Sequence, residues 1–220
     1  MSIATLILGE SGTGKSASLR NFNPADVLLI QAIPKALPFK AKGWNNNNAK
    51  EVGLTILQSD NVQQINRALA RTRKDIIIID DFQYLMGNEF MRRGLEKGYD
   101  KFTEIGIHAW EVFNQVTQLP DNKRVYILSH TQTDEFGKTK IKTIGKMLDE
   151  KITLEGMLAI VLRTHVSQGE YKFSTQNNGS DTVKSPMGMF EDQLIDNDLK
   201  MVDDRICEYY NLTTEETSNG

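Results

Sequence analysis

The glycine-rich segment GESGTGKS, at residues 9–16, is the feature of this sequence that most restricts its fold. It follows the apolar run TLIL (5–8) directly and precedes SASLRNF (16–22), a stretch that can form a helix. Glycine adopts backbone conformations that other residues avoid, so successive N–H groups of such a turn can converge on one anion. A helix start adds the positive end of its dipole. The segment therefore predicts an anion-binding turn between a first strand and a helix.

The same segment matches the Walker A pattern, G-x-x-x-x-G-K-[ST], in the strand–loop–helix context that the pattern requires. Lys15 would bring a positive charge to the β- and γ-phosphates of a nucleotide, and Ser16 would supply a hydroxyl ligand to Mg²⁺. A glycine-rich turn that matches by chance is the alternative interpretation. The residues expected to bind the nucleotide are Gly9, Glu10, Ser11, Gly12, Thr13, Gly14, Lys15, Ser16 and Ala17.

Two adjacent carboxylates end the apolar run in DIIIIDDFQYL, residues 75–85. Asp80 closes a strand that should be buried, and it is placed to hold Mg²⁺ through a water molecule, as the Walker B acid does. Asp81 has two interpretations. It could orient or deprotonate an attacking water, or it could cap the segment FQYL that follows.

Short apolar runs recur at 5–8, 26–30, 54–57, 76–80 and 124–129, and helical patterns lie between them. Several of these runs are apolar on both sides, which is typical of a parallel sheet covered by helices on both faces. A helix is expected over 59–73 with Asp60 as its N-cap, and a longer helical region over about 88–118 that Pro120 ends. The alternation predicts an open α/β sheet.

The pattern changes after Ser129. Residues 131–150 read as a polar loop, and LAIVLRTHV with EYKFSTQ predicts a β-hairpin that leaves the sheet and turns at SQG. The stretch NDLKMVDDRICEYY predicts a terminal helix whose face Leu199–Val202–Ile206 packs on the core. The last residues, TTEETSNG, are expected to form a frayed tail.

Bulk composition narrows the class further. A chain of 220 residues fits a single domain, and its one cysteine, Cys207, excludes an internal disulfide framework and suits a reducing cytoplasm. The N-terminal stretch has no basic region and its apolar run is too short for a signal peptide or an anchor, so no membrane partner is expected. A net charge of −3 argues against a generally basic nucleic-acid coat but leaves room for a local basic patch.

Taken with the glycine-rich loop, three further segments carry a family resemblance: IIIIDDFQYLM, SHTQTDEFGKTKIKTIGKMLDEK and GSDTVKSPMGMFED. The chain resembles phage-encoded P-loop ATPases with a RecA-like core, usually described as AAA-type ATP-binding proteins, from Ile3 to about Tyr210. The resemblance implies an α/β fold with a RecA-like P-loop ATPase domain over 1–190, followed by a C-terminal helix and acidic flexible tail over 191–220.

The same resemblance implies a function. It suggests an oligomeric, ring- or filament-forming ATPase that binds ATP and Mg²⁺ and acts on single-stranded DNA in phage recombination, annealing or replication. Phage replication or recombination proteins would be its partners, in the cytoplasm of a bacterial host. Two other readings stay open: a helicase loader or AAA+-type adaptor whose ATP state controls a protein partner, and a small-molecule kinase. The kinase reading lacks an arginine-rich lid.

The sequence departs from the family at the catalytic base. RecA-type ATPases place a glutamate after the second core strand, where this chain has Gln31, which can position water but cannot take its proton. Asp81 is therefore the expected base, with a contribution from Glu10 or slow hydrolysis as alternatives. His130, after the strand at 124–129, matches the position that senses the γ-phosphate, although a purely structural histidine is the other reading.

Charged residues suggest contacts beyond the nucleotide. RecA-like proteins carry a mobile DNA-contacting loop where this chain has Lys138, Lys140, Lys142 and Lys146, which could follow a phosphate backbone. Ordinary solvated lysines are the alternative, because acidic residues dilute the charge of this segment. Arg163 and Lys184 are candidates for a cation supplied to the site of a neighbouring subunit, or else surface charges.

Overall fold

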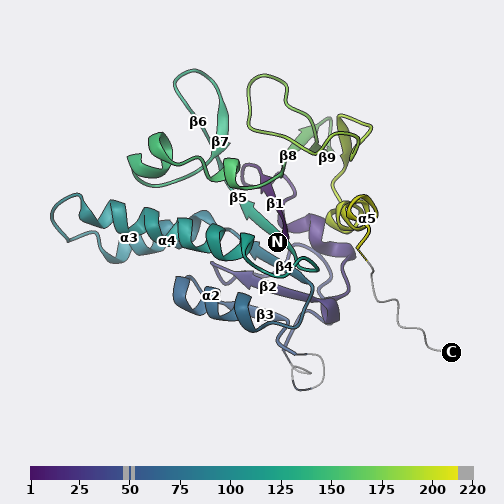
Figure 1. Cartoon of the computed structure of the whole chain (residues 1–220), viewed down its shortest axis with the longest axis horizontal. Coiled ribbons are helices and arrows are strands. Elements are labelled where there is room, and N and C mark those ends of the chain that lie inside the picture. Colours follow the sequence, from purple (N-terminus) through teal and green to yellow (C-terminus); the bar gives the residue numbers. More distant parts are fainter. Residues whose placement is uncertain (47–49, 51–52, 213–220) are drawn as a thin grey trace.

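The computed structural model describes residues 1–46, 50 and 53–212, and within them eight strands form one sheet in the order β10-β9-β8-β1-β5-β4-β2-β3 (Figure 1). From β8 to β3 all neighbours are parallel, whereas β9 and β10 are antiparallel additions at one edge. The predicted α/β fold with a mostly parallel sheet is confirmed. The strands are β1 (Ile3–Leu8), β2 (Val27–Gln31), β3 (Ile56–Gln58), β4 (Ile76–Asp80), β5 (Arg124–Ser129), β8 (Ile160–Ser167), β9 (Glu170–Ser174) and β10 (Leu194–Asp196).

Helices cover both faces of this sheet (Figure 1). One face packs against α2 (Val62–Arg71), α3 (Gln83–Arg92) and α4 (Asp100–Thr117), and the other against the short helix η1 (Ser16–Asn21) and α5 (Leu199–Tyr210). A strand between two helical layers buries both of its faces, which explains why the four isoleucines of β4 stand in sequence without alternation. Shorter helical turns are η2 (Pro24–Asp26), η3 (Met147–Lys151) and η4 (Leu154–Met157).

The helix after the glycine-rich loop is shorter than expected. It is a 3₁₀ helix of six residues, Ser16–Asn21, and not an α-helix. Pro24 follows closely, and proline disfavours helical backbone in the residue before it. A dipole from so short a helix contributes little, so anion binding at this loop depends on backbone N–H groups and Lys15.

The N-cap of α2 differs from the sequence prediction. Asn61, and not Asp60, caps α2, because its side chain accepts the N–H of Gln64 at 2.9 Å. Asp60 instead accepts hydrogen bonds from Asn88 and Arg92, both on α3. Asp60 and Asn61 are both residue types that cap helices, and the contacts of Asp60 with α3 leave the capping position to Asn61.

The predicted helical region 88–118 is two helices. The chain leaves helical geometry between α3 and α4 at residues 93–99, where Gly98 has φ +94°. Leu95 in this link is fully exposed. The predicted end is confirmed, since α4 stops at Thr117, before Pro120.

The second half of the chain is more ordered than expected. The β8–β9 hairpin turns at Gln168 and Gly169 as predicted, but it does not leave the sheet, because β8 pairs in parallel with β1 from Thr5↔Ile160 onward. The segment expected to be a loop contains a two-stranded hairpin, β6 (Thr131–Thr133) with β7 (Thr139–Ile141), and the π-helical turn η3. This hairpin projects from the body of the molecule (Figure 1).

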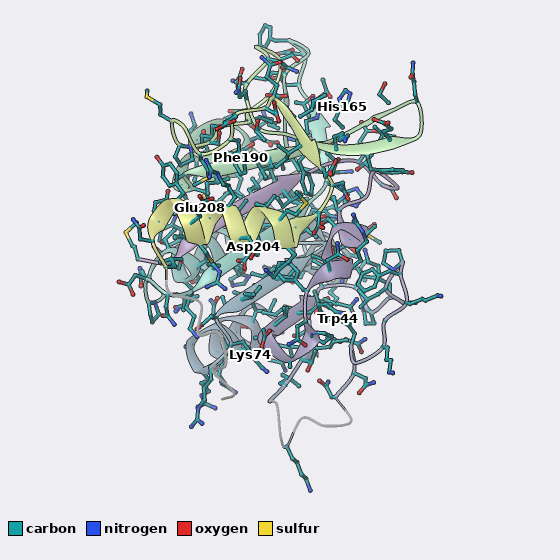
Figure 2. The ribbon with its side chains drawn as sticks, turned by 90° about the vertical axis from the view of Figure 1, so that its right-hand side faces the viewer. Trp44, Lys74, His165, Phe190, Asp204 and Glu208 are labelled. Atoms are coloured by element: carbon teal, nitrogen blue, oxygen red, sulfur yellow. The ribbon has the colours of Figure 1, made fainter. Side chains whose placement is uncertain are left out.

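The terminal helix α5 packs as predicted, with Leu199, Val202 and Ile206 fully buried. Figure 2 shows it lying along one side of the molecule, with Asp204 and Glu208 on its outward side. Residues 213–220, where a frayed tail was expected, lie outside the described residues. In the part of the chain that the structure describes, no helix has both the length and the apolarity needed to cross a membrane.

A buried ion pair joins α5 to the sheet. Asp203 accepts a hydrogen bond from Nε of Arg124 at 2.6 Å and another from the hydroxyl of Tyr126 at 2.6 Å. All three side chains are buried. Burial, reinforced by the charge of Asp203, raises the pKa of Tyr126 well above its ordinary value, so its hydroxyl keeps the proton that it donates.

Candidate functional site

A cavity of about 560 Å³ lies where the parallel strands β1, β2, β4 and β5 end. Open α/β sheets collect their ligands at this edge. The glycine-rich loop forms one wall, the loop after β2 forms another, and residues from β9 and from beyond β10 complete it. Its lining residues are Ser11, Gly12, Gly14, Lys15, Ser16, Ala17, Arg20, Lys35, Ala36, Pro38, Asp81, His130, Tyr171 and Asn197.

The nine residues predicted to bind a nucleotide divide between two cavities. Six of them, at positions 11, 12 and 14–17, line the larger cavity. Gly9, Glu10 and Thr13 line a second cavity of about 290 Å³, which shares no lining residue with the first. The backbone of Gly14 has φ +95°, and a Cβ there would lie 3.0 Å from side-chain atoms of both Asn197 and Tyr171. Glycine is therefore required at this position for both backbone and space.

Lys15 is held inside the loop. Its Nζ donates hydrogen bonds to the carbonyl oxygens of Gly9 and Glu10, each at 2.8 Å. Burial lowers the pKa of Lys15 to about 8, although the charges of Asp81 and Asp80 act in the opposite direction. An anion entering the cavity would stabilise the charged form of this lysine.

Ser16 and Asp80 meet across the site, as the sequence predicted for magnesium ligands. The Ser16 hydroxyl lies 3.1 Å from Oδ1 and 2.9 Å from Oδ2 of Asp80 and donates to that carboxylate. Burial raises the pKa of Asp80, while the charge of Lys35 opposes this change. A hydroxyl and a carboxylate are the hard oxygen donors that Mg²⁺ prefers, so the residues present fit that ion.

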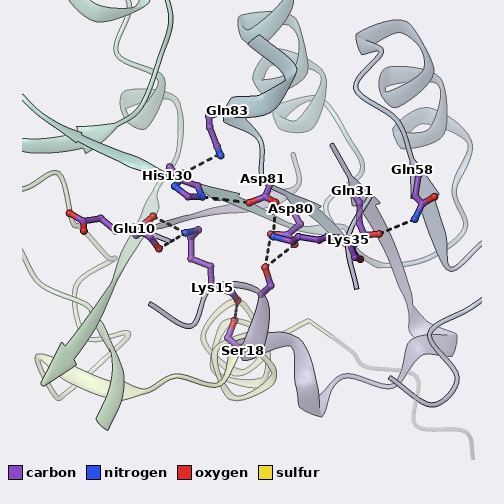
Figure 3. A network of polar contacts seen from close by, with 12 residues as sticks. Glu10, Lys15, Ser18, Gln31, Lys35, Gln58, Asp80, Asp81, Gln83 and His130 are labelled. Carbon is purple, nitrogen blue, oxygen red and sulfur yellow. Dashed lines mark hydrogen bonds and ion pairs between the residues drawn. The ribbon is translucent and has the colours of Figure 1, made fainter. Parts of the chain in front are cut away.

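Lys35 is the cation that pairs with both aspartates (Figure 3). Its Nζ lies 2.5 Å from Oδ2 of Asp81 and 3.4 Å from Oδ2 of Asp80. Burial alone would raise the pKa of Asp81, but the contacts with His130 and Lys35 outweigh it, and the pKa of Asp81 falls below its ordinary value. Asp81 is thus a carboxylate with two cationic or polar neighbours.

The side chain of Asp81 does not cap the following helix. The N-cap residue of α3 is Phe82, and no side-chain hydrogen bond caps the helix at this position. Asp81 itself has a left-handed backbone with φ +60°. Its Oδ1 lies 3.7 Å from Nε2 of His130. The backbone N–H of His130 is in turn held by Oε1 of Gln83 at 3.2 Å (Figure 3). The structure therefore turns Asp81 and His130 toward the same cavity.

Gln31, which could position water according to the sequence, lies away from the cavity. It is buried and does not line the cavity. Its Nε2 donates to the carbonyl oxygen of Lys35 at 3.1 Å, and its Oε1 accepts from Gln58 at 3.4 Å. Gln31 thus anchors the loop that carries Lys35.

Arg163 belongs to β8 and Lys184 lies beside that strand, both outside the larger cavity. Arg163 lines the second cavity, and its Nη1 lies 3.6 Å from Oδ2 of the buried Asp181. The backbone of Lys184 pairs with Val161 through two hydrogen bonds of 2.8 and 2.9 Å. Each of the two side chains remains partly exposed.

The four lysines of the predicted DNA-contacting segment line neither of these two cavities. Lys138, Lys142 and Lys146 are exposed. Lys140 is tied to Asp149, since its Nζ lies 3.3 Å from the carbonyl oxygen and 3.7 Å from Oδ1 of that residue. Phe136 at the tip of the β6–β7 hairpin is 87% exposed.

Sequence reasoning missed six lining residues, the apolar Ala36 and Pro38 and the polar Arg20, Lys35, Tyr171 and Asn197. Arg20 donates to the carbonyl oxygen of Asn197 at 2.6 Å, which joins η1 to the residue that follows β10. The Nδ2 group of Asn197 is buried without a hydrogen-bond partner. No motif or spacing marks these residues. Tyr171 and Asn197, for example, reach the site because β9 and β10 join the sheet beside β8.

No protein-family model matches this chain, and no curated protein matches its sequence.

Proposed function

We propose that this chain is a P-loop ATPase with a RecA-like core, which binds Mg-ATP in the larger cavity and hydrolyses it. The observation that carries the proposal is the hydrogen bond from Ser16 to Asp80, two residues 64 positions apart. It brings a hydroxyl from the glycine-rich loop onto a strand-end carboxylate, with Lys15 in the same cavity wall. A cavity of about 560 Å³ also falls within the range of roughly 300–1,000 Å³ that is usual for small-molecule sites.

Each residue of the site has a role in this proposal. Lys15 and the backbone N–H groups of the loop bind the phosphates, and Ser16 with Asp80 holds Mg²⁺. When bound, that ion neutralises phosphate charge in the transfer. Asp81 orients the attacking water and accepts its proton, and His130 responds to the terminal phosphate. A lowered pKa makes Asp81 a weak base, so it contributes more through orientation than through proton abstraction.

Titration calorimetry with ATP and Mg²⁺ tests the proposal directly. We expect one adenine nucleotide to bind per chain, and GTP in a parallel titration defines the base preference. Absence of binding by folded protein would overturn the assignment. Transfer of the γ-phosphate to a nucleoside or sugar, in place of water, would identify a kinase.

The substitution Asp81→Asn should separate binding from turnover. We expect the affinity for Mg-ATP to change little, because Ser16, Asp80 and Lys15 remain. Hydrolysis should fall roughly a hundredfold, because the carboxylate that orients the attacking water and accepts its proton is lost. Single-turnover rates and calorimetry measure the two quantities. Asp121→Asn, on the surface before β5, is the matched control. Unchanged hydrolysis in Asp81→Asn would move the base elsewhere.

Single-stranded DNA is the proposed macromolecular partner in a homo-oligomer, with ATP-dependent control of a protein partner as the alternative. The exposed Phe136 and the neighbouring lysines on a projecting hairpin favour DNA, because they offer stacking and phosphate contacts together. Stimulation of ATP hydrolysis by single strands of any sequence supports this choice, and dependence on a protein partner supports the adaptor. Arg163 and Lys184 stay candidates for a cation contributed to a neighbouring subunit.

Replacing Lys138, Lys140 and Lys142 by alanine is expected to weaken DNA binding and flatten its salt dependence. Each lost phosphate contact reduces the slope of log affinity against log salt by roughly 0.7 for a single strand, so three contacts remove about 2. Lys140 should contribute least, since Asp149 already binds it. The triple variant Lys40→Ala, Lys42→Ala and Lys50→Ala controls for net charge. An equal slope in both variants would exclude the hairpin from the DNA interface.

A further inference from the structure

Lys35 is placed against the two carboxylates at the centre of the site, although no motif includes it. It belongs to the loop after β2, and the hydrogen bond from Gln31 to its carbonyl oxygen fixes the backbone beneath its side chain. The Lys35 side chain is 36% exposed, whereas those of Asp80 and Asp81 are 1% and 7% exposed. The lysine therefore approaches a buried acidic pair from the open side of the cavity.

The contacts of Lys35 overlap with those that a magnesium ion would need. Oδ2 of Asp80 accepts the Ser16 hydroxyl at 2.9 Å and lies 3.4 Å from Nζ of Lys35. A divalent cation bound by Ser16 and Asp80 would therefore stand beside the ammonium group, and two cations at one carboxylate repel each other. Lys35 and the metal ion compete for the same charge.

Lys35 also faces the phosphate-binding side of the site. It lines the same cavity as Lys15, Ser16 and His130. The two ammonium groups therefore face one space, and an anion between them would be attracted to both. A lysine is a point charge on a flexible four-carbon stem, so it can change partners without movement of its backbone.

We propose that Lys35 is a second phosphate-directed cation. It pairs with Asp80 and Asp81 when no divalent ion is bound, and it contacts the terminal phosphate of the nucleotide when a divalent ion is bound. This inference rests on the proposed binding of Mg-ATP. It places a charge-neutralising group in cis, where many oligomeric ATPases rely on a neighbouring subunit. It also gives the site a preference for triphosphate over diphosphate.

Two binding measurements on Lys35→Ala test the inference, and neither requires turnover. In the first, Mn²⁺ alone is titrated into nucleotide-free protein and followed by electron paramagnetic resonance. Loss of the competing ammonium should tighten Mn²⁺ binding by roughly fivefold or more, the lower end of usual coupling between sites. In the second, a non-hydrolysable ATP analogue and ADP are compared in Mg²⁺ by calorimetry. The preference for the triphosphate should fall about tenfold, as expected for one charged hydrogen bond.

Lys40→Ala, on the same loop but outside the cavity lining, is the matched control and should change neither quantity. The two expected changes have opposite directions, so a misfolded variant, which would bind both ligands more weakly, cannot imitate them. Unchanged Mn²⁺ affinity, or an unchanged triphosphate preference, in Lys35→Ala refutes the inference while leaving the ATPase proposal intact. Failure of the unsubstituted protein to bind any nucleotide overturns both.

Discussion

Replacing Lys15 by alanine is expected to lower the affinity for Mg-ATP by roughly a hundredfold and to remove measurable hydrolysis. A hydrogen bond to a charged group contributes about 1.5–3 kcal/mol, and each 1.4 kcal/mol changes the affinity about tenfold. Lys15 is expected to contact two phosphates, so the substitution removes two such contacts. Calorimetry and a steady-state phosphate-release assay measure the two effects.

The alanine variant also removes two internal hydrogen bonds, because Nζ of Lys15 donates to the carbonyl oxygens of Gly9 and Glu10. Lys15→Met, which keeps the length of the stem, shows how much of the effect comes from charge alone. Thermal melting of both variants checks that the loop change leaves the fold intact. Full turnover by either folded variant would contradict the assignment of this loop to phosphate binding.

The substitution Asp203→Ala is expected to cost roughly 3–5 kcal/mol of unfolding free energy. It would leave the buried guanidinium of Arg124 without its carboxylate and the hydroxyl of Tyr126 without its acceptor. Removing one partner of a buried pair has this large effect because the remaining charge is neither solvated nor neutralised. For a chain of this size, the melting temperature should fall by roughly 10 °C.

Asp204→Ala is the matched control for this measurement. Asp204 is adjacent in sequence, exposed, and paired with Lys200 on the surface of α5, so its removal should change stability by less than about 1 kcal/mol. Arg124→Met combined with Asp203→Leu should recover much of the lost stability, since an apolar pair needs no counter-charge. Equal melting temperatures for the two alanine variants would show that the buried pair contributes nothing to stability.

The strands and the glycine-rich loop could be predicted because their signals are local. The run Ile76–Ile79 is apolar without alternation, and only a doubly covered strand buries such a run. The order of Lys15, Ser16 and Asp80 along the chain likewise needs no knowledge of distant contacts. The structure brings Ser16 and Asp80 within hydrogen-bond distance, as that order implied.

Predictions failed where distant parts of the chain decide the outcome. The β8–β9 hairpin looked independent of the sheet, because nothing within it signals that β1 is its parallel neighbour. The break between α3 and α4 lies in a stretch whose apolar spacing still fits one helix. Lys35 gave no signal, since its importance comes from two carboxylates on a different strand.

The hydrogen bond between Arg20 and Asn197 joins residues 177 positions apart, and it has a consequence for biosynthesis. Domains fold as the ribosome delivers them, beginning at the N-terminus. The glycine-rich loop emerges well before Tyr171 and Asn197, which close the cavity against it. A nascent chain therefore carries the glycine-rich turn without the wall that encloses the cavity until β9 and the residue after β10 have been synthesised.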